Sequence, residues 1–189
     1  MKILVEHKLF LHPEKCEFHQ SQIEYLELVI SENKVEMDPV KVARVYKWPT
    51  PENWTDMQAF IGFVNFYRRF IRDFSIIARP LFDLTHSDKA WNWDAKEQKA
   101  FECLKIAVTT IPVLGSSQGS EPFCIEADSS DFVSRAVLSQ QLPGEEKWHL
   151  VAFYSKSLSL VERNYKIHDK EILAIICTLE EWRHFLEGA

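Results

Sequence analysis

The clearest pattern of hydrophobic positions in the chain lies between residues 55 and 74. Apolar residues recur there at the spacing of one face of an α-helix: Met57, Phe60, Ile61, Val64, Tyr67, Ile71 and Phe74. Thr55 followed three residues later by Gln58 has the capping-box pattern and predicts the start of the helix. We therefore expect a helix whose apolar stripe belongs to a hydrophobic core.

A second stripe of the same segment is polar and contains a glycine. Its members are Gln58, Gly62, Asn65, Arg69 and Arg72. A glycine inside a helix costs about 1 kcal/mol relative to alanine, so its presence requires a reason. Close approach of another backbone, or of a nucleic-acid strand, would be such a reason.

Two other regions have the patterns of strands. The segment IEYLELVISENKVEM has a turn-like stretch at residues 31–34 and predicts a β-hairpin. Strands are also expected at about residues 121–128, 134–142 and 148–156, with Gly144 in the last turn. A long helix should follow, opened by the capping box of Ser159 and Glu162 and ending at about residue 187. With shorter helices near 38–47 and 76–85, the pattern predicts an α+β protein.

Composition narrows the class of protein without identifying it. With 189 residues, 46% of them hydrophobic and 26% charged, the chain is an ordinary globular protein. The four cysteines lie far apart without a CxxC pair, so we expect no disulfide framework. No membrane span or signal peptide is recognisable, so we expect a cytoplasmic protein with no membrane partner. The polar stretch GSSQGS, residues 115–120, is the best candidate for a flexible domain boundary.

The net charge of −6 argues against tight nucleic-acid binding by the chain as a whole. Basic residues nevertheless cluster in the stretch YRRFIRDFSIIAR, where a single acid, Asp73, is set against Arg68, Arg69, Arg72 and Arg79. A local basic face of this kind can bind phosphates even on an acidic protein.

The strand expected at residues 121–128 carries acids on one side. Phe123, Ile125 and Ala127 would point to one side of the strand. The residues between them, Cys124, Glu126 and Asp128, would point to the other side. A solvated edge strand would explain the pattern, and so would a metal-binding carboxylate at the end of a core strand. The residues alone leave both explanations open.

Several segments in a fixed order resemble the reverse transcriptase polyprotein of gypsy-type LTR retrotransposons. They cover nearly the whole chain and include KLFLHPEKCEF, KVARVYKWPTP, FIGFVNFYRRFIRDFSIIARPLFDLT, WNWDAKEQKAF, IEADSSDFVSRAVLSQQ, VAFYSKSLSLVERNY and IHDKEILAI. The resemblance implies the end of the polymerase palm with its primer-grip hairpin (residues 1–36), a helical thumb (37–87), a connection segment (88–117) and a truncated RNase H-like domain (118–189). That domain would be a partial three-stranded antiparallel sheet with one long helix.

The same resemblance implies catalytic roles. Asp128 and Glu171 would be the first two catalytic carboxylates of an RNase H site and ligands for Mg²⁺ or Mn²⁺. Two such ions about 4 Å apart can activate the attacking water and stabilise the leaving oxygen, and Mg²⁺ prefers carboxylate oxygens. Glu171 also lies one helical turn from Ile167 and from Ile175, and an acid on an apolar stripe is costly unless it is paired or metal-bound.

The polymerase aspartate pair and the two later RNase H acids of the resembled family have no counterpart in the sequence. We therefore expect weak metal binding and no polymerase or nuclease activity from this chain alone, although the parent family has both activities.

The resemblance also implies a nucleic-acid interface on the thumb. Gln58, Gly62 and Phe66 would face a primer-template or RNA/DNA hybrid, with Arg69 and Arg72 near phosphates. In the alternative, the arginines form a solvated face and Phe66 belongs to the core. The remainder of the polyprotein would be a further partner, and a virus-like particle would be the location of the parent element.

Three features of the sequence depart from the family pattern. Glu27 and Leu28 replace a usual Gly-His pair in the hairpin, and ADSS at residues 127–130 replaces TDAS. Arg135 replaces a usual glycine beside the expected active site. Each departure puts the activity of even the longer parent protein in question.

Three functions remain open at this point. The chain could bind nucleic acid without turning it over, and salt-sensitive binding without cleavage would favour this function. It could instead form a homodimer through residues 121–128, because an exposed edge strand invites pairing with another chain. It could also be a metal-dependent nuclease completed by an unexpected acid, in which case Asp128→Asn would abolish cleavage.

Overall fold

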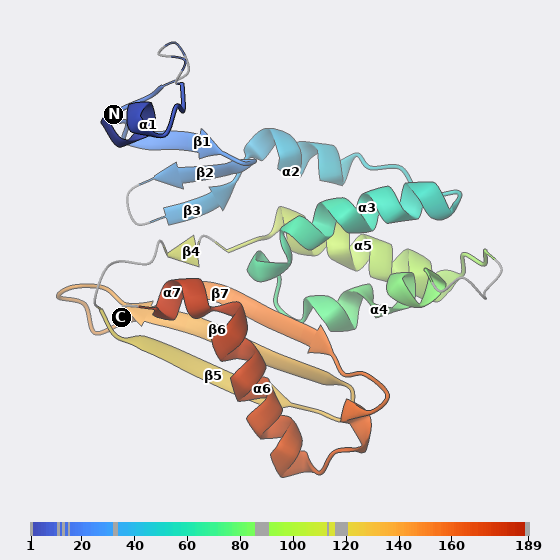
Figure 1. The fold of residues 1–189 in the computed structure, drawn as a ribbon. Coiled ribbons are helices and arrows are strands. Elements are labelled where there is room, and N and C mark those ends of the chain that lie inside the picture. Colours follow the sequence, from blue (N-terminus) through green and yellow to red (C-terminus); the bar gives the residue numbers. More distant parts are fainter. Residues whose placement is uncertain are drawn as a thin grey trace.

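The computed structural model describes residues 2–10, 12, 14, 16–31, 34–85, 91–112, 114–115 and 121–187. Within these ranges, a group of helices lies beside the first of two antiparallel sheets, and the second sheet lies below both in the view of Figure 1. The first sheet lies beside α2 and α5, and the second is covered on one face by α6 and α7. The predicted α+β class is confirmed.

The first sheet has the strand order β1-β2-β3-β4. Its strands are β1 (Gln22–Tyr25), β2 (Leu28–Ser31), β3 (Lys34–Met37) and β4 (Leu114–Gly115), and a short helix, α1 (Lys2–Glu6), precedes them. The predicted hairpin is present, but its segment turns once more than expected. Leu26 and Glu27 form a turn with φ of 46° and 66°, the left-handed conformation of many two-residue hairpin loops. Residues 32–33 of the predicted turn lie outside the described residues.

The four main helices beside the first sheet are α2 (Pro39–Tyr46), α3 (Trp54–Phe66), α4 (Phe74–Leu84) and α5 (Ala95–Thr109). The predicted start of α3 is wrong by two residues. Asn53 is the N-cap, and its Oδ1 accepts a hydrogen bond from the Asp56 backbone N–H at 3.0 Å, whereas Thr55 lies inside the helix. Asn is as good an N-cap as Thr, so the spacing alone did not distinguish the two.

The apolar stripe predicted from the sequence continues past the end of α3. The helix ends at Phe66, a short 3₁₀ helix, η2 (Arg68–Phe70), follows, and Asp73 with φ of 56° precedes α4. The chain changes direction there while its apolar residues stay buried, so Tyr67, Phe70 and Phe74 still belong to the core.

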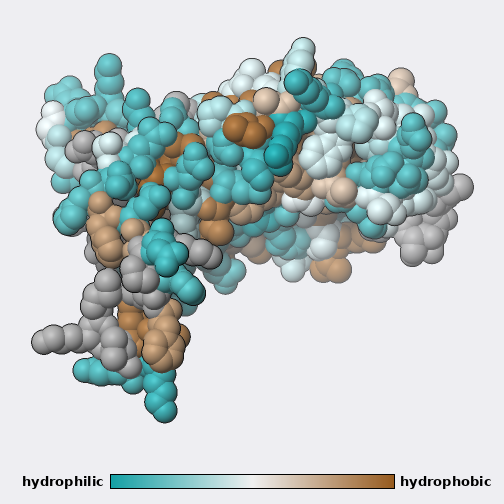
Figure 2. Space-filling model, turned by 90° about the horizontal axis from the view of Figure 1, so that it is seen from above, coloured by the Kyte–Doolittle hydropathy of each residue, from teal (hydrophilic) through white to brown (hydrophobic). Residues whose placement is uncertain are grey.

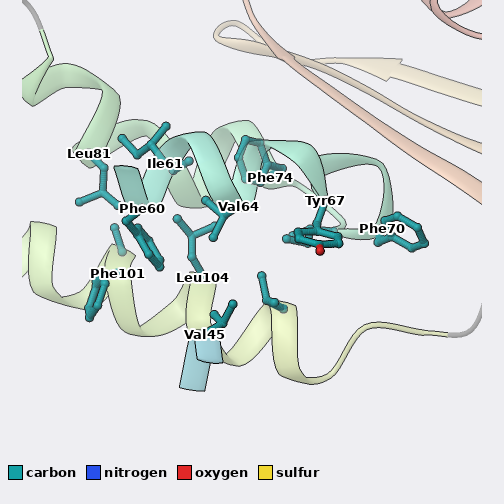
Figure 3. Packing of buried hydrophobic residues seen from close by; sticks show 14 of the residues in the cluster. Val45, Phe60, Ile61, Val64, Tyr67, Phe70, Phe74, Leu81, Phe101 and Leu104 are labelled. Atoms are coloured by element: carbon teal, nitrogen blue, oxygen red, sulfur yellow. The ribbon is translucent and has the colours of Figure 1, made fainter. Parts of the chain in front are cut away.

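That stripe is the centre of the larger of two hydrophobic clusters (Figure 3). Phe60 and Val64 are fully buried, and the Phe60 ring centroid lies 4.6 Å from that of Phe101 on α5. Val45 of α2 and Leu104 of α5 close the cluster around them. Removal of these aromatic and aliphatic surfaces from water is the main contribution to the stability of this part of the chain. The predicted core stripe is confirmed.

The second sheet has the order β5-β6-β7, and every neighbouring pair is antiparallel. Its strands are β5 (Phe123–Ser129), β6 (Val133–Gln141) and β7 (Trp148–Ser157), with Gly144 at φ of 79° in the last turn. The predicted three-stranded sheet is confirmed. The capping box of Ser159 and Glu162 is also present, but it opens a short 3₁₀ helix, η3 (Glu162–Asn164). The expected long helix is divided into α6 (Ile167–Glu181) and α7 (Arg183–Leu186).

A smaller cluster around Trp182 joins α6 and α7 to the second sheet. The two clusters are linked by polar contacts between α4 and β7, since the Ser75 Oγ donates to the Ser155 backbone oxygen at 2.7 Å. An ion pair between Arg68 and Glu181, at 2.6 Å, adds a second link. The domain limits remain a prediction, and residues 116–120 of the expected flexible joint lie outside the described residues.

The surface of the first sheet and its helices is mainly hydrophilic, with small separate hydrophobic patches (Figure 2). Among the described residues, no helix combines the length and the apolar character needed to cross a membrane.

Candidate functional site

Asp128 lies near the end of β5, directly opposite Arg135 on β6. The Arg135 side chain donates two hydrogen bonds to the Asp128 Oδ2, from Nε at 2.9 Å and from Nη2 at 2.7 Å. Hydrogen bonding to this carboxylate, followed by its charge, raises the pKa of the Arg135 guanidinium above its ordinary value. The candidate catalytic carboxylate is therefore already bound to a cation that belongs to the protein.

The two faces of the second sheet carry different chemistry. Side chains alternate between faces along a strand, so Ala127 faces the α6 side, where Tyr154 packs against Trp182 at 6.2 Å. Asp128 and Arg135 point to the opposite face, toward the helical part of the chain. A second carboxylate lies on that face, with the Asp73 Oδ1 3.9 Å from the Arg135 Nη1.

Glu171 lies in the second turn of α6 and is exposed. Its Oε2 is 4.0 Å from the Nδ1 of His168, itself an exposed side chain. The buried face of α6 is instead formed by Lys170, Ala174 and Thr178. The expectation that Glu171 interrupts a buried apolar stripe is therefore not met, because Ile167 and Ile175 are themselves about half exposed, at 46% and 47%.

Asp128 and Glu171 do not fit a divalent-metal site in this arrangement. A guanidinium already neutralises Asp128, and a nearby positive charge disfavours a divalent cation. Glu171 lies on α6, while the Asp128 side chain points to the sheet face opposite α6, whereas a two-metal site needs both carboxylates to converge on one point. In the described part of the chain, no group of three or more His, Cys, Asp or Glu side chains could hold a metal ion. Metal ligation by this pair stays a prediction that would require Arg135 to release Asp128.

The residues predicted to face nucleic acid, Gln58, Gly62 and Phe66, lie on the open side of α3. Gln58 and Gly62 are exposed, and Phe66 is 48% exposed. A Cβ built on Gly62 would have no neighbouring atom within 4 Å. Phe66 packs edge-on against Tyr67 at 5.0 Å but is not part of the buried cluster. The alternative that places Phe66 in the core does not hold.

The two predicted phosphate contacts differ from each other. Arg72 is well exposed, with 74% of its side chain accessible and only a long contact of 3.9 Å to Asp73. Arg69 is partly buried, with its guanidinium 4.9 Å above the Phe70 ring, and burial lowers the pKa of this guanidinium. Arg72 is thus available to a ligand, while Arg69 already has a position between the two clusters.

Two ionic contacts could not be found by reading the sequence. Glu27, in the left-handed turn of the hairpin, pairs with Lys41 at 2.5 Å and accepts a hydrogen bond from the buried Tyr67 hydroxyl at 3.2 Å. Lys170 is almost completely buried and its Nζ lies 2.9 Å from the Asp131 Oδ1. Each pair joins residues far apart in the chain, and no linear spacing indicates it. The one indication in the sequence was that Glu27 stands where the resembled family usually has a glycine.

The fold and the second sheet agree with one class of protein. A family model described as the RNase H-like domain found in reverse transcriptase matches residues 93–189. The chain belongs to this family of reverse transcriptase RNase H-like domains. Among its relatives are the transposon Tf2-3 and Tf2-4 polyproteins of Schizosaccharomyces pombe, each 37% identical over 180 residues. These matches cover 95% of this chain but only 13% of each polyprotein. The predicted resemblance to a gypsy-type retrotransposon polyprotein is confirmed.

Solved structures share the fold at low sequence identity. The foamy viral protease-reverse transcriptase dRH in complex with ds DNA matches with a TM-score of 0.77 and 18% identity, over 97% of this chain and 32% of that one. The same viral protein in complex with RNA/DNA hybrid matches with a TM-score of 0.75 and 18% identity, over 89% and 23%. Such a likeness establishes the arrangement of helices and sheets.

The Glu27 contact leads to a pH-dependent prediction. Hydrogen bonding from Lys41 is the largest of the effects that lower the pKa of Glu27 below its ordinary 4.5. The contribution of the ionised Glu27 carboxylate to the free energy of unfolding is therefore complete above pH 4.5. It is lost as the pH falls through the lower pKa of Glu27 in the folded state. Glu27→Gln should reduce the free energy of unfolding at neutral pH by about 0.5–1 kcal/mol.

Urea denaturation at neutral pH and at steps below pH 4.5 measures this effect. The difference between Glu27→Gln and the parent protein should shrink toward zero at the acid end. Glu24→Gln, which changes an exposed carboxylate on β1, is the matched control and should show little difference at any pH. A Glu27→Gln difference that stays constant across the series would contradict the pair's role.

Proposed function

We propose that this chain is a nucleic-acid-holding part of a retrotransposon reverse transcriptase polyprotein, and that it binds primer-template or RNA/DNA hybrid without cleaving it. The observation that carries the proposal is the open space around Gly62. The chain spans 13% of the polyproteins that it matches, so the activity of a whole polyprotein is not assigned to it.

No contact within the described part of the chain requires a glycine at position 62. Nothing there would clash with a Cβ, yet glycine costs about 1 kcal/mol in a helix interior. We infer that the absence of a side chain lets a ligand outside these residues approach the helix backbone closely. Gln58 precedes Gly62 by one turn and Phe66 follows it by one turn, so an amide and an aromatic ring flank the open position. Such a surface suits the sugars and base edges of a duplex groove, and Arg72 would contact a phosphate.

The structural neighbours support the choice of ligand. The two foamy viral proteins with the same fold are complexes with ds DNA and with RNA/DNA hybrid. Their likeness covers most of this chain, including the helical part that carries Gly62. What they bind is a property of those proteins, and it makes a duplex the first ligand to test here.

The absence of cleavage follows from the contacts of Asp128. The Arg135 guanidinium, which donates two hydrogen bonds to Asp128, supplies the positive charge that a metal ion would otherwise supply. Mg²⁺ or Mn²⁺ ligation by Asp128 and Glu171 would need this pair to open. The family uses divalent metals in general, but this chain's own residues bind the carboxylate instead.

Gly62→Leu should separate binding from stability. Leucine restores helix propensity and meets no neighbour, so the melting temperature should stay equal or rise. Affinity for a labelled RNA/DNA hybrid, measured by fluorescence anisotropy, should fall about tenfold because the side chain occupies the approach path. Ala95→Leu, an exposed small-to-large change on α5, is the control and should leave affinity unchanged. Equal affinities for Gly62→Leu and the parent protein would overturn the proposed interface.

A cleavage assay tests the second half of the proposal. The protein and its Asp128→Asn variant are incubated with labelled RNA/DNA hybrid and Mn²⁺, and products are separated on a gel. Neither protein should cut the hybrid, because Arg135 binds the Asp128 carboxylate and the Asp128 side chain points away from α6, which carries Glu171. Cleavage by the parent protein that disappears in Asp128→Asn would show a working metal site and refute this part.

A second candidate function is self-association, and the position of β5 favours it. β5 is an edge strand of the second sheet, and among the described residues no strand pairs with the outer side of residues 123–129. The outer face of α6 adds exposed apolar surface, because Ile172, Ile175, Ile176 and Leu179 are each about half exposed. A homodimer through residues 121–128 would cover the edge.

Sedimentation equilibrium over a wide concentration range, together with hydrogen exchange of the β5 amides, tests this candidate. Dimerisation through the edge predicts a rising mass and slower exchange in residues 123–129 as concentration increases. A monomer at every concentration, with constant exchange rates, would rule it out.

A further inference from the structure

A cavity of about 530 Å³ lies between the helical part of the chain and the second sheet. One wall contains Asn65, Arg68 and Arg79, and the other contains Lys156, Arg163 and Glu181. The cavity is distinct from the surroundings of Asp128 and Arg135, since neither of these residues lines it.

The two walls are held together before any ligand arrives. The Ser75 backbone N–H donates to the Ser155 Oγ at 3.1 Å, and the Ser75 Oγ donates to the Ser155 backbone oxygen at 2.7 Å. Arg68 and Glu181 form the ion pair that joins α6 to η2 across the cavity. A preformed site loses less conformational freedom when it binds a ligand.

Two of the four basic residues of the cavity are already occupied by carboxylates. Arg68 pairs with Glu181 at 2.6 Å, and Lys156 pairs with Glu162 at 3.1 Å. The other two are less committed. The Arg79 Nε is 3.8 Å from the Asp83 Oδ2, and Arg163 has no carboxylate partner within the described ranges.

Phe132 holds both of these arginines in place. The guanidinium carbons of Arg79 and Arg163 each lie 5.6 Å from the centroid of its ring. Cation–π contact at this distance is favourable and leaves the guanidinium N–H groups free to donate. The Arg163 Nε donates to the Leu158 backbone oxygen at 3.0 Å, which fixes its orientation further. Two guanidinium groups thus line one cavity, and guanidinium is the side-chain group that donates most readily to phosphate oxygens.

The cavity continues the surface assigned to the duplex. Asn65, one of its lining residues, lies on α3 one helical turn after Gly62. A strand that passes over Gly62 would therefore have its next phosphates beside the cavity. Continuity of this kind favours a backbone phosphate over a free small anion.

We propose that this cavity binds a phosphodiester of the same nucleic-acid duplex, with Arg79 and Arg163 as the phosphate ligands. The proposal rests on the proposed function, because it places the backbone of the ligand that α3 contacts. It also assigns a role to residues on both sides of the cavity, so that a bound strand would bridge the thumb and the RNase H-like sheet.

Salt dependence of hybrid binding gives the test. Anisotropy titrations with an RNA/DNA hybrid are repeated over a series of salt concentrations for the parent protein, Arg79→Gln and Arg163→Gln. Each variant should bind about 3- to 10-fold more weakly at moderate salt, and the slope of log K against log salt should fall by about one. Asp83→Asn should bind more tightly, because it frees Arg79. Arg183→Gln removes the same charge from an exposed arginine outside the cavity and should change neither quantity.

The outcomes separate this proposal from the proposed function. If the parent protein and Gly62→Leu differ in affinity while Arg79→Gln and Arg163→Gln match Arg183→Gln, the cavity proposal is wrong and the α3 interface stands. If the parent protein does not bind hybrid at all, both fail. Direct binding of inorganic pyrophosphate, measured by calorimetry, that is lost in Arg79→Gln while hybrid affinity is unchanged would show a small-anion site and overturn the proposal. Melting temperatures equal to that of the parent protein confirm that the variants are folded.

Discussion

Burial of one stripe of α3 determines which side of this helix is open to a ligand. Met57, Phe60 and Val64 are fully buried against α2 and α5, and moving any of them out of the cluster would leave a cavity. Because side chains three or four residues apart share one face of a helix, this burial turns the Gly62 side outward. The nucleic-acid interface proposed here is thus a consequence of core packing, and the core would have to be rebuilt to move it.

The junction between the two hydrophobic clusters depends on polar contacts. Ser75 with Ser155 and Arg68 with Glu181 hold α4 against β7, while Arg135 contacts Asp128 within the sheet and approaches Asp73 from the other side. The first two contacts line the basic cavity, and the third neutralises Asp128. Arg135 is therefore a structural partner of Asp128 and Asp73 in this fold.

Periodic patterns predicted most of the helices and strands, because burial of an apolar stripe follows directly from spacing, whereas the family was indicated by the resemblance of whole segments. The apolar stripe from Met57 to Phe74 and the three strands of the second sheet were predicted in this way. Local features were less predictable. Asn53 and Thr55 are comparable caps, and the turn at Leu26–Glu27 lacks the usual glycine or asparagine. The partners of Asp128 and Lys170 depend on strand register and helix docking, which linear spacing does not encode.

The measurement that tests the account most directly is an NMR titration of the isotopically labelled protein with an RNA/DNA hybrid. The account predicts that the largest amide shift changes cluster at Gln58, Gly62 and Asn65 on α3 and extend to Arg79 and Arg163, while the outer face of α6 changes little. Shift changes confined to β5 and the exposed isoleucines of α6, or none along α3, would contradict it and would assign the helical face of this chain another role.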